Sequence, residues 1–292
     1  MKKIAVTHNL NLSDAQKKRL GRLGEVTYYE SFPKTNKIWL KRTQGANIIC
    51  SRKTGLEDSY IKLKNVVISV PFVDVSWGDL KIIKKNEITL LNSPGCNKHA
   101  VSEWIIGMII NMLRDLPNSI HSTETLHEKS TLGLKDKRIV ILGKGNIGKQ
   151  VGKISKAFEM KISFFKKGDD LVKKVSKADI IVNCLSTNKK TVGLLDKKFF
   201  NSLKKESYFV SVTTRDIYNP LSLIEALDNG ILNGVALDAA STRYRHDEDV
   251  LYKKLSRHPK IMTTSYTAGR TDVSSKISND MMIENLEKFL KK

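Results

Sequence analysis

Cysteine is scarce in this 292-residue chain, which has only three cysteines, at positions 50, 96 and 184. They lie far apart, and the sequence contains neither a Cys-x-x-Cys pair nor a cluster of cysteine with histidine. This pattern excludes a disulfide framework and the common zinc sites. We therefore expect no bound metal and a reducing, cytoplasmic environment.

Long apolar runs are also missing. The most apolar one, residues 104–113, is about half the length that a bilayer-crossing helix needs, and Arg114 ends it. The first six residues lead straight into a strand pattern and lack the apolar stretch and cleavage site of a signal peptide. We therefore expect a soluble cytoplasmic protein with no membrane partner.

Acidic residues are few relative to basic ones, 30 against 51, so the formal net charge is +21. Such an excess invites a nucleic-acid-binding interpretation. Here, however, the lysines occur in ones and twos along the chain, without a block of five like charges or interleaved aromatic residues. We interpret most of the charge as a solvated lysine surface and expect no nucleic-acid partner. The alternatives are a nucleic-acid-binding face and attraction of an anionic substrate or cofactor.

The rest of the composition is that of an ordinary globular protein, with 40% hydrophobic residues, 17 glycines and 6 prolines. At about 100–200 residues per domain, this length predicts two domains. Short apolar strands alternate with helical segments, which predicts parallel sheets covered on both faces. The expected strands are residues 4–6, 26–29, 48–50, 66–70, 88–91, 138–142, 161–165, 180–185, 208–212, 234–237 and 260–262.

Helix signals fall between these strands. Ser13 opens the first helix with capping-box spacing. A long helix is expected at residues 98–116, after which Pro117 and the polar segment 118–130 redirect the chain. An amphipathic helix is expected at residues 271–290. The pattern predicts two doubly wound α/β units in tandem.

A glycine-rich segment, GKGNIG at residues 143–148, follows an apolar strand and opens a helix, as the dinucleotide-binding motif requires. The first glycine allows a tight turn, the second lets the backbone approach a pyrophosphate, and the third lets helix and strand pack closely. The N–H groups at the helix N-terminus receive the phosphate charge. The alternative is a glycine-rich turn without a ligand. The predicted cofactor-binding residues here are Gly143, Gly145, Asn146, Ile147 and Gly148.

The end of the next strand favours NADP over NAD. In NAD sites a carboxylate about 20 residues beyond the motif holds the adenosine ribose hydroxyls. Lys166 and Lys167 occupy that position, and the first acid is Asp169. Because lysines attract a 2′-phosphate and a carboxylate repels it, we predict that these two lysines bind NADP. The alternative is an NAD site beside two ordinary surface lysines.

Further segments carry a family resemblance. They are NSPGCN at 92–97, AVSE at 100–103, LGLKDK at 132–137, VGLL at 192–195, TTRD at 213–216 and GVALD at 234–238. Their order and spacing resemble those of the D-isomer-specific 2-hydroxyacid dehydrogenases, such as glycerate, phosphoglycerate and D-lactate dehydrogenases and glyoxylate/hydroxypyruvate reductases. The likeness covers most of the chain.

The resemblance implies a flavodoxin-like substrate domain formed by residues 1–99 and 268–292, and a Rossmann NAD(P)-binding domain formed by residues 100–267. It also implies an active site between the two domains and a homodimer formed through the cofactor domains. The expected fold class is therefore α/β, with two doubly wound parallel-sheet domains.

The family's chemistry is hydride transfer between a nicotinamide and C2 of a 2-hydroxy or 2-oxo acid. By resemblance Arg215 is the catalytic arginine, whose planar fork holds the substrate carboxylate and polarises the C2 carbonyl. Asp238 falls on the acid that binds the nicotinamide carboxamide. The alternatives are a surface ion pair for Arg215 and a capping or turn aspartate for Asp238. Ser186, Thr213 and Ala268 are further implied cofactor contacts.

Two catalytic positions depart from the family pattern: Tyr266 replaces the acid–base histidine, and Arg243 replaces its partnering glutamate. A free tyrosine has a pKa of about 10 and is a poor base at neutral pH, but neighbouring cations favour the phenolate. A Tyr–Arg pair is therefore a coherent replacement, with Tyr266 as the proton donor. The alternatives are a cofactor-binding regulatory relative with lost or altered catalysis, and a reductase whose proton comes from His99, His246 or water.

The substrate pocket is expected in two loops of the first domain, after residues 50 and 70. Backbone N–H groups at strand carboxyl ends suit a carboxylate. Arg52 and Lys53 either add charge for a phosphorylated or dicarboxylic acid or are simply solvated. The bulky segment 71–73 favours a small substrate such as glyoxylate, hydroxypyruvate or glycerate. The predicted substrate-binding residues are Arg52, Lys53, Thr54, Val73, Asp74 and Arg215.

Overall fold

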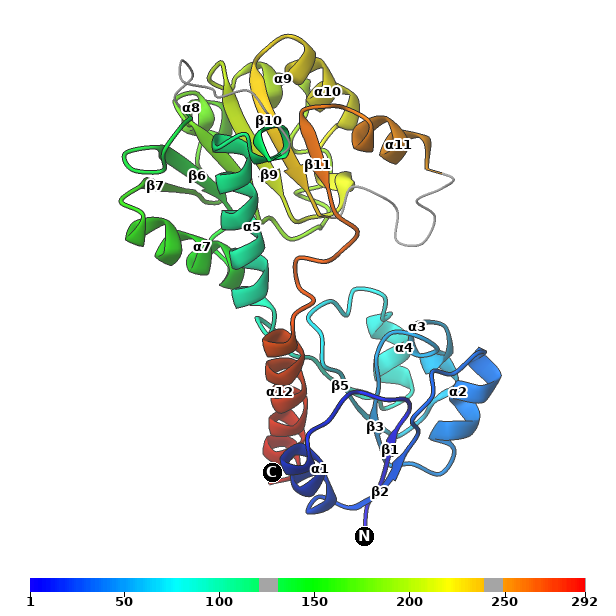
Figure 1. Cartoon of the computed structure of the whole chain (residues 1–292). Helices are drawn as coiled ribbons and strands as arrows, with labels where there is room; N and C mark the ends of the chain where they lie inside the picture. Colours follow the sequence, from blue (N-terminus) through cyan, green and yellow to red (C-terminus); the bar gives the residue numbers. More distant parts are fainter. Residues whose placement is uncertain (121–130, 239–248, 292) are drawn as a thin grey trace. The chain divides into compact units, whose positions relative to one another are not determined.

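The computed structural model describes residues 1–120, 131–238 and 249–291. The chain forms two compact units, one of Met1–Asn97 with Thr271–Lys292 and the other of Lys98–Arg270. Each unit is built around a parallel sheet (Figure 1). The predicted fold class, two doubly wound α/β domains, is confirmed. The assignment of the substrate to the first domain and the cofactor to the second stays a prediction.

The first unit contains a five-stranded sheet in the order β2-β1-β3-β4-β5. Cys50 pairs with Val6 on one side and with Ser69 on the other, and Ser69 pairs with Leu91, so the carboxyl ends of four strands form one edge. The strands are β1 (Lys3–Val6), β2 (Glu25–Tyr28), β3 (Ile48–Cys50), β4 (Val67–Ser69) and β5 (Thr89–Leu91). The helices are α1 (Asp14–Gly21), α2 (Asn36–Thr43), α3 (Leu56–Ser59), η1 (Tyr60–Lys62), α4 (Leu80–Lys85) and α12 (Asp272–Leu290).

The core of the first unit lies on both faces of this sheet. Successive side chains of a strand point to opposite faces. Ile48 accordingly packs in a cluster with Met282 of α12, while Ile49 packs in another cluster with Trp39 of α2. All four side chains are fully buried. This two-sided burial explains why β3 is a continuous apolar run.

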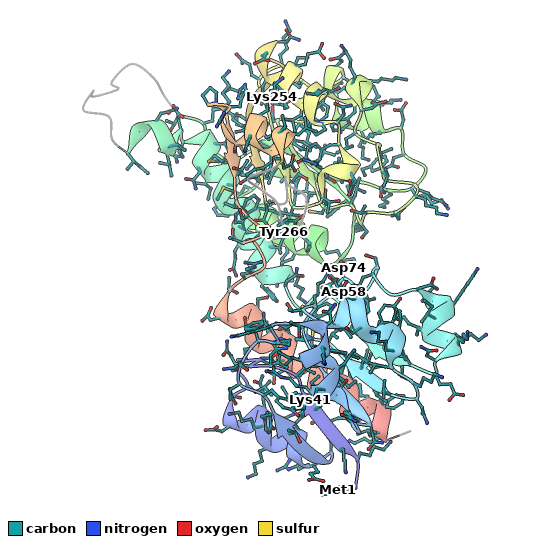
Figure 2. All side chains as sticks on the ribbon, turned by 90° about the vertical axis from the view of Figure 1, so that its right-hand side faces the viewer. Met1, Lys41, Asp58, Asp74, Lys254 and Tyr266 are labelled. Atoms are coloured by element: carbon teal, nitrogen blue, oxygen red, sulfur yellow. The ribbon has the colours of Figure 1, made fainter. Side chains whose placement is uncertain are left out.

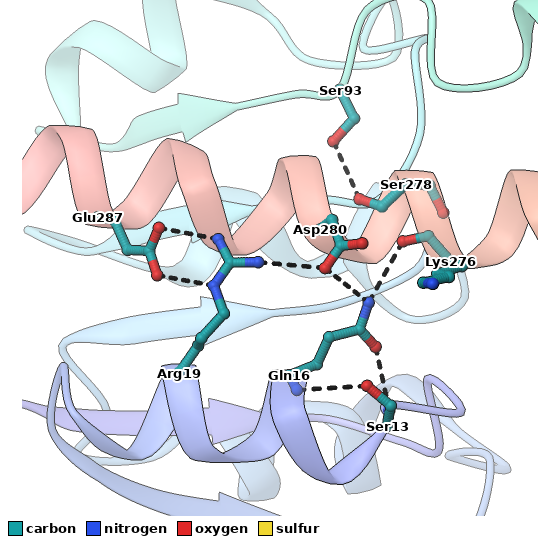
Figure 3. A network of polar contacts seen from close by, with 8 residues as sticks. All are labelled: Ser13, Gln16, Arg19, Ser93, Lys276, Ser278, Asp280 and Glu287. Carbon is teal, nitrogen blue, oxygen red and sulfur yellow. Dashed lines mark hydrogen bonds and ion pairs between the residues drawn. The ribbon is translucent and has the colours of Figure 1, made fainter.

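Polar contacts attach the C-terminal helix α12 to α1 (Figure 3). The predicted capping box is present, because Ser13 and Gln16 bond to each other's backbone N–H groups. The Gln16 side chain also donates to Asp280 (2.9 Å). The Arg19 guanidinium donates to both carboxylate oxygens of Glu287 (2.9 and 2.8 Å) and to Asp280 (3.1 Å). These contacts explain why the last helix of the chain belongs to the first unit.

The second unit contains a six-stranded parallel sheet in the order β11-β10-β9-β8-β6-β7. The strands are β6 (Arg138–Leu142), β7 (Lys161–Phe165), β8 (Ile180–Asn183), β9 (Ser207–Ser211), β10 (Leu232–Leu237) and β11 (Ile261–Thr263). The helices are α5 (Lys98–Leu113), α6 (Leu116–Ser119), α7 (Asn146–Ala157), α8 (Leu171–Val175), α9 (Lys197–Asn201), η2 (Arg215–Ile217), α10 (Pro220–Asp228) and α11 (Val250–Ser256).

The strand order of the second unit points to a ligand site. After β6 the chain adds β7 on one side of that strand, and it then crosses back to add β8 on the other side. Ligands of open α/β sheets bind outside the carboxyl ends of the strands at such a reversal. The glycine-rich segment directly follows β6 and therefore lies at this point.

The long helix predicted at residues 98–116 is shorter in the structure. The helix α5 ends at Leu113, and Asp115 takes a left-handed conformation with φ of 49°. A separate short helix, α6, then begins with Pro117 in its first turn, where the missing N–H is tolerated. Part of the expected crossover segment 118–130 lies outside the described residues. In the parts of the chain that the structure describes, no helix combines the length and apolarity needed to cross a membrane.

Candidate active site

The glycine-rich turn after β6 has the geometry that a pyrophosphate needs. Gly143 has φ of 99°, and a Cβ on it would lie 3.0 Å from the Cys184 carbonyl oxygen. A Cβ on Gly148 would lie 2.0 Å from the Gly143 carbonyl oxygen, so α7 packs directly on the turn. At Gly145, in contrast, an added Cβ meets nothing within 4 Å. The backbone is therefore open to a ligand at the motif's second glycine.

The N-terminus of α7 lies in this turn. Gly145 is its N-cap and has no side chain to satisfy the first helical N–H groups. Asn146 and Ile147 form the start of the helix, with Asn146 exposed and Ile147 half-buried. A helix N-terminus leaves about four N–H donors unsatisfied, and its dipole favours an anion. The residues present therefore fit a dinucleotide phosphate group.

The turn after β7 contains exposed lysines, and its first acidic residue, Asp169, bonds to the backbone of the same turn. Lys166 and Lys167 are exposed. The Asp169 carboxylate accepts a hydrogen bond from the Lys166 backbone N–H (2.9 Å) and lies 3.5 Å from Lys174 Nζ. The first of these contacts, and then the second, lowers the pKa of Asp169. Asp169, the first acid after the predicted ribose position, thus stabilises the turn through these contacts.

The carboxylate of Asp238, at the end of β10, organises the segment that follows β11. Its Oδ1 accepts hydrogen bonds from Thr264 Oγ1 (2.6 Å), the Thr267 N–H (2.8 Å) and the Ala268 N–H (3.1 Å). Its backbone carbonyl accepts from the Tyr266 N–H (2.8 Å). Within the described residues the hydrogen bonds to the carboxylate all end on Oδ1. No feature of the sequence indicated that Thr264 and Thr267 belong to this arrangement.

Tyr266, labelled in Figure 2, has φ of 54°. A bulky residue in the left-handed region is an outlier that costs about 1–3 kcal/mol and needs support from its surroundings. The bonds from Asp238 to Tyr266 itself and to Thr267 provide that support. Strained residues of this kind cluster at functional sites. The backbone of Tyr266, the predicted replacement for the family histidine, is therefore held in this conformation by Asp238.

Arg215, in η2 just after β9, is bound by an aspartate that the sequence did not reveal as part of the site. Its Nη1 lies 2.6 and 2.5 Å from the two carboxylate oxygens of Asp249. Asp249 is 6% exposed and caps α11 by accepting from the Tyr252 N–H (3.1 Å). The contacts use Nη1, so Asp249 does not occupy the Nη2 and Nε donors. The only sequence signal was an aspartate preceding a helix.

A second phenol lies near these residues. Tyr218 is buried, and in the described part of the chain its hydroxyl has no hydrogen-bond partner. Burial raises the pKa of Tyr218, and the nearby charge of Arg215 opposes this only in part, while Tyr266 adds to it. Tyr218 therefore stays protonated beside the candidate catalytic residues. Arg243, the predicted partner of Tyr266, and His246 lie outside the described residues.

The other predicted cofactor contacts lie in the loops after β8 and β9. Thr213 accepts a hydrogen bond from the buried Asn183 amide (2.8 Å), which ties the two strand ends together. The Ser186 carbonyl accepts from Thr191 Oγ1 (2.7 Å) and from the Asn188 amide (2.9 Å). Both loops are thus fixed at the carboxyl edge of the sheet, the edge that also carries the glycine-rich turn.

In the first unit, Lys53 is already paired with acids. Its Nζ lies 2.8 Å from Asp74, which is labelled in Figure 2, and 3.2 Å from Glu57. Partial burial pushes the pKa of Asp74 upward, but hydrogen bonds from Lys53 and Ser76 outweigh it and hold that pKa far below its usual range. The lysine charge is therefore largely neutralised within the loops. Thr54 and Val73 are exposed, and Arg52 is half-buried.

A buried histidine at the end of β1 was not singled out from the sequence. Trp39 Nε1 donates to Ser51 Oγ (3.0 Å), which itself donates to the Arg52 carbonyl (2.8 Å). The 2.8 Å contact between Thr7 and Ser51 hydroxyls must therefore use the Thr7 proton. Thr7 then accepts from His8 Nδ1 (3.0 Å), which places the imidazole proton on Nδ1. No group of three or more potential metal-binding side chains occurs among the described residues.

Comparison with known proteins agrees with this geometry. The family profile described as "D-isomer specific 2-hydroxyacid dehydrogenase, NAD binding domain" matches residues 106–268, more than half of the chain. The chain belongs to the D-isomer-specific 2-hydroxyacid dehydrogenase family. The matched span runs from α5 to Ala268 and includes the glycine-rich turn, Arg215, Asp238 and Tyr266.

Individual relatives are more distant. A D-lactate dehydrogenase of Staphylococcus epidermidis is 25% identical over 219 residues, which are 66% of this chain and 66% of that protein. A D-3-phosphoglycerate dehydrogenase of Bacillus subtilis is 25% identical over 263 residues, 82% of this chain and 49% of that protein. The matches thus span about two thirds or less of these relatives. An acyclic imino acid reductase, solved with NADPH and D-Arg, shares the fold with a TM-score of 0.84 at 19% identity, covering 99% of this chain and 97% of that one.

Proposed function

We propose that this protein is an NADP-preferring oxidoreductase that transfers a hydride between a nicotinamide and C2 of a small 2-oxo or 2-hydroxy acid. One observation carries the proposal. The open glycine-rich turn, Arg215 and the strained Tyr266 turn all follow the carboxyl ends of strands of the same sheet. Family membership supports the cofactor and the reaction class.

The residues have distinct roles in this proposal. The bound nicotinamide supplies the hydride. Arg215 uses its fork to hold the substrate carboxylate and polarise the C2 carbonyl, while Asp249 fixes the guanidinium through Nη1. The Tyr266 hydroxyl gives its proton to the developing alkoxide, so that reduction yields a 2-hydroxy acid. Asp238 Oδ2 accepts from the nicotinamide amide, because Oδ1 is occupied by the chain itself.

The remaining predicted contacts complete the proposal. Ser186, Thr213 and Ala268 line the cofactor, and the loops with Arg52, Thr54 and Val73 contribute to the substrate side. Since Lys53 and Asp74 pair with each other, their contribution is to shape those loops and not to add net charge. This favours a small monocarboxylate such as glyoxylate, hydroxypyruvate or glycerate. A homodimer through the cofactor domain and a cytoplasmic location also belong to the proposal.

NADP preference is tested by direct binding. Lys166 and Lys167 are exposed, and Asp169 is turned toward the Lys166 backbone, which supports a 2′-phosphate site. We expect isothermal titration calorimetry to give a lower Kd for NADPH than for NADH. Tighter binding of NADH would overturn the assignment.

A second candidate function is a cofactor-binding regulatory protein with lost catalysis. The replacement of histidine by Tyr266 favours it, because a phenol is a weak base at neutral pH. The decisive assay follows NADPH oxidation with glyoxylate, hydroxypyruvate and pyruvate. Turnover of any of these acids supports the reductase, whereas tight NADPH binding without turnover of any of them supports the regulatory protein.

A further inference from the structure

A third lysine lies at the predicted adenosine end of the cofactor site. Lys144 stands between the first two glycines of the motif and is exposed. The strands β6 and β7 pair with Leu142 opposite Phe165, so the turns that follow them are neighbours. Lys144 and Lys166 therefore extend from adjacent strand ends.

The position of Lys144 is fixed by an aromatic ring. Its Nζ lies 5.3 Å from the centroid of the Phe164 ring, within the range of a cation–π contact. Phe164 is in turn packed against α7 at Gly152, where an added Cβ would lie 2.8 Å from the ring's Cζ. Because only glycine leaves room for the ring there, Gly152 determines where the ring lies. The ring then determines where the ammonium group lies.

The acids of this region do not neutralise the lysines. Asp169 accepts from the Lys166 backbone and contacts Lys174, and Asp170 accepts from the Lys173 N–H (3.1 Å) as the N-cap of α8. Among the described residues, no carboxylate lies within ion-pair distance of Lys144, Lys166 or Lys167. Three lysines that pair with no described carboxylate thus lie in the neighbouring turns after β6 and β7, and a Rossmann domain holds the adenosine ribose at the end of the second of these strands.

We propose that Lys144 is a specificity-determining residue that binds the 2′-phosphate of NADP together with Lys166 and Lys167, and that Phe164 and Gly152 position it. This inference rests on the proposed NADP preference. A phosphate monoester carries nearly two negative charges and three acceptor oxygens, which suits several ammonium groups converging from two turns. The cation–π contact orders the Lys144 stem before the ligand arrives and so reduces the entropy lost on binding.

The first test is Lys144→Gln, with Kd values for NADPH, NADH, 2′,5′-ADP and 5′-AMP measured by calorimetry. Loss of one charge-assisted hydrogen bond is expected to raise the Kd of NADPH and 2′,5′-ADP about 10-fold. The Kd values of NADH and 5′-AMP should change less than about 2-fold. Lys149→Gln, which removes an exposed lysine from the first turn of α7, is the matched control and should change none of them.

Two outcomes would overturn the role of Lys144. Equal weakening of NADPH and NADH would place the lysine on the pyrophosphate, and unchanged binding of both would make it an ordinary surface residue. The result is separable from the proposed function. If the unmodified protein prefers NADH, the NADP assignment itself fails, whereas a wild-type NADPH preference that survives Lys144→Gln contradicts only this inference. Binding is measured without turnover and does not depend on catalysis.

The second test concerns positioning. Gly152→Ala forces the Phe164 ring to move and should weaken NADPH binding several-fold while leaving NADH binding unchanged. Phe164→Leu removes the ring but keeps an apolar side chain, and it provides the same readout if Gly152→Ala does not fold. Circular dichroism checks folding of both variants. A normal NADPH-to-NADH affinity ratio in folded Phe164→Leu would show that the ring does not position Lys144.

Discussion

At the scale of single residues, the candidate site depends on one carboxylate serving several partners. Asp238 bonds through Oδ1 to Thr264, Thr267 and Ala268 and through its carbonyl to Tyr266. The turn it closes keeps Tyr266 at a positive φ, which an isolated chain would avoid. In the proposed mechanism Asp238 therefore has two roles, because it orients Tyr266 and binds the cofactor.

Removing the Tyr266 hydroxyl tests its proposed part in proton transfer. We expect Tyr266→Phe to lower kcat by about 10²–10⁴-fold, because a positioned general acid contributes about that much, while the Kd for NADPH stays unchanged. The control is Tyr208→Phe, which removes a hydroxyl bonded to Asn233 (2.9 Å) at the amino end of the same sheet. An unchanged rate in Tyr266→Phe would refute the proton-donor role.

The pairing of Arg215 with Asp249 gives a second prediction. Asp249→Asn removes the negative charge that compensates a guanidinium whose side chain is 20% exposed. We expect the free energy of unfolding to fall by about 1–3 kcal/mol and kcat/KM to fall at least about 10-fold. Urea denaturation and steady-state kinetics with the best 2-oxo acid check both. Full activity in the variant would show that Arg215 needs no such support.

His8 gives a prediction about pH. Burial, and then the charges of Arg52 and Arg42, lower the pKa of His8 from 6.5 to about 4. Between pH 6.5 and about 4, His8 is therefore protonated in the unfolded chain but neutral in the folded chain. The free energy of unfolding accordingly decreases as the pH falls from 6.5 toward 4. Nitrogen-15 NMR should show a neutral ring with its proton on Nδ1 at pH 6. A ring that titrates near 6.5 would contradict the burial argument.

At the scale of elements, the contact between α1 and α12 keeps a distant part of the chain in the first unit. Arg19 bonds to Glu287 in bidentate geometry, while Lys288 and Glu284 form an ordinary exposed pair on the same helix. Bidentate arginine pairs in a network are the surface ion pairs most able to stabilise a protein, and exposed single pairs contribute little.

We therefore expect Arg19→Met to lower the free energy of unfolding by about 1 kcal/mol in urea denaturation, while Lys288→Met changes it by only a few tenths. The bonds from Arg19 lower the pKa of Glu287 below 4.5. The stabilisation from the Arg19–Glu287 pair is accordingly present above pH 4.5, and it is lost as the pH falls through the lower pKa that Glu287 has in the folded protein. An equal effect of both variants would mean that the network adds nothing.

Helices and strands were predicted correctly where interactions between neighbouring residues determine them, and were missed where distant contacts do. The apolar run of β6 and its following glycines were predictable, since the motif lies within a few consecutive residues after the strand and Gly148 packs directly on Gly143. The end of α5 at Leu113 was not, because Asp115 is an unremarkable helix residue until it adopts a left-handed conformation. Asp249 was missed because its partner Arg215 is 34 residues away in the sequence.

At the scale of the whole molecule, the net charge of +21 comes from lysines spread along the chain, and a few of them lie at the proposed cofactor site. Scattered lysines raise the potential around the entire protein, which speeds encounter with any anion. Lysines 144, 166 and 167, which pair with no carboxylate among the described residues, place part of this charge at the proposed 2′-phosphate site, where the two nicotinamide cofactors differ.

The affinities for NADPH and NADH should therefore depend differently on salt concentration. Raising the ionic strength shortens the screening length, to about 8 Å at 0.15 M, and weakens exposed charge pairs. We expect the Kd of NADPH to rise more steeply with KCl than that of NADH, by about 10-fold from low to physiological salt. Parallel salt dependences would indicate that the charge acts only as a diffuse field.

The sequence by itself determined the alternation of strands and helices and the glycine-rich turn, and it led to the assignments of Arg215, Asp238, Tyr266 and Arg243, which stay predictions. These inferences depend on residues that are close together in the sequence, or on the spacing of motifs that resembles that of the family. Only the tertiary structure decided that Asp249 binds Arg215, that Asp238 supports the positive φ of Tyr266, and that Lys144 contacts the Phe164 ring packed at Gly152. Such contacts join residues that are distant along the chain, and no local propensity encodes which of them meet.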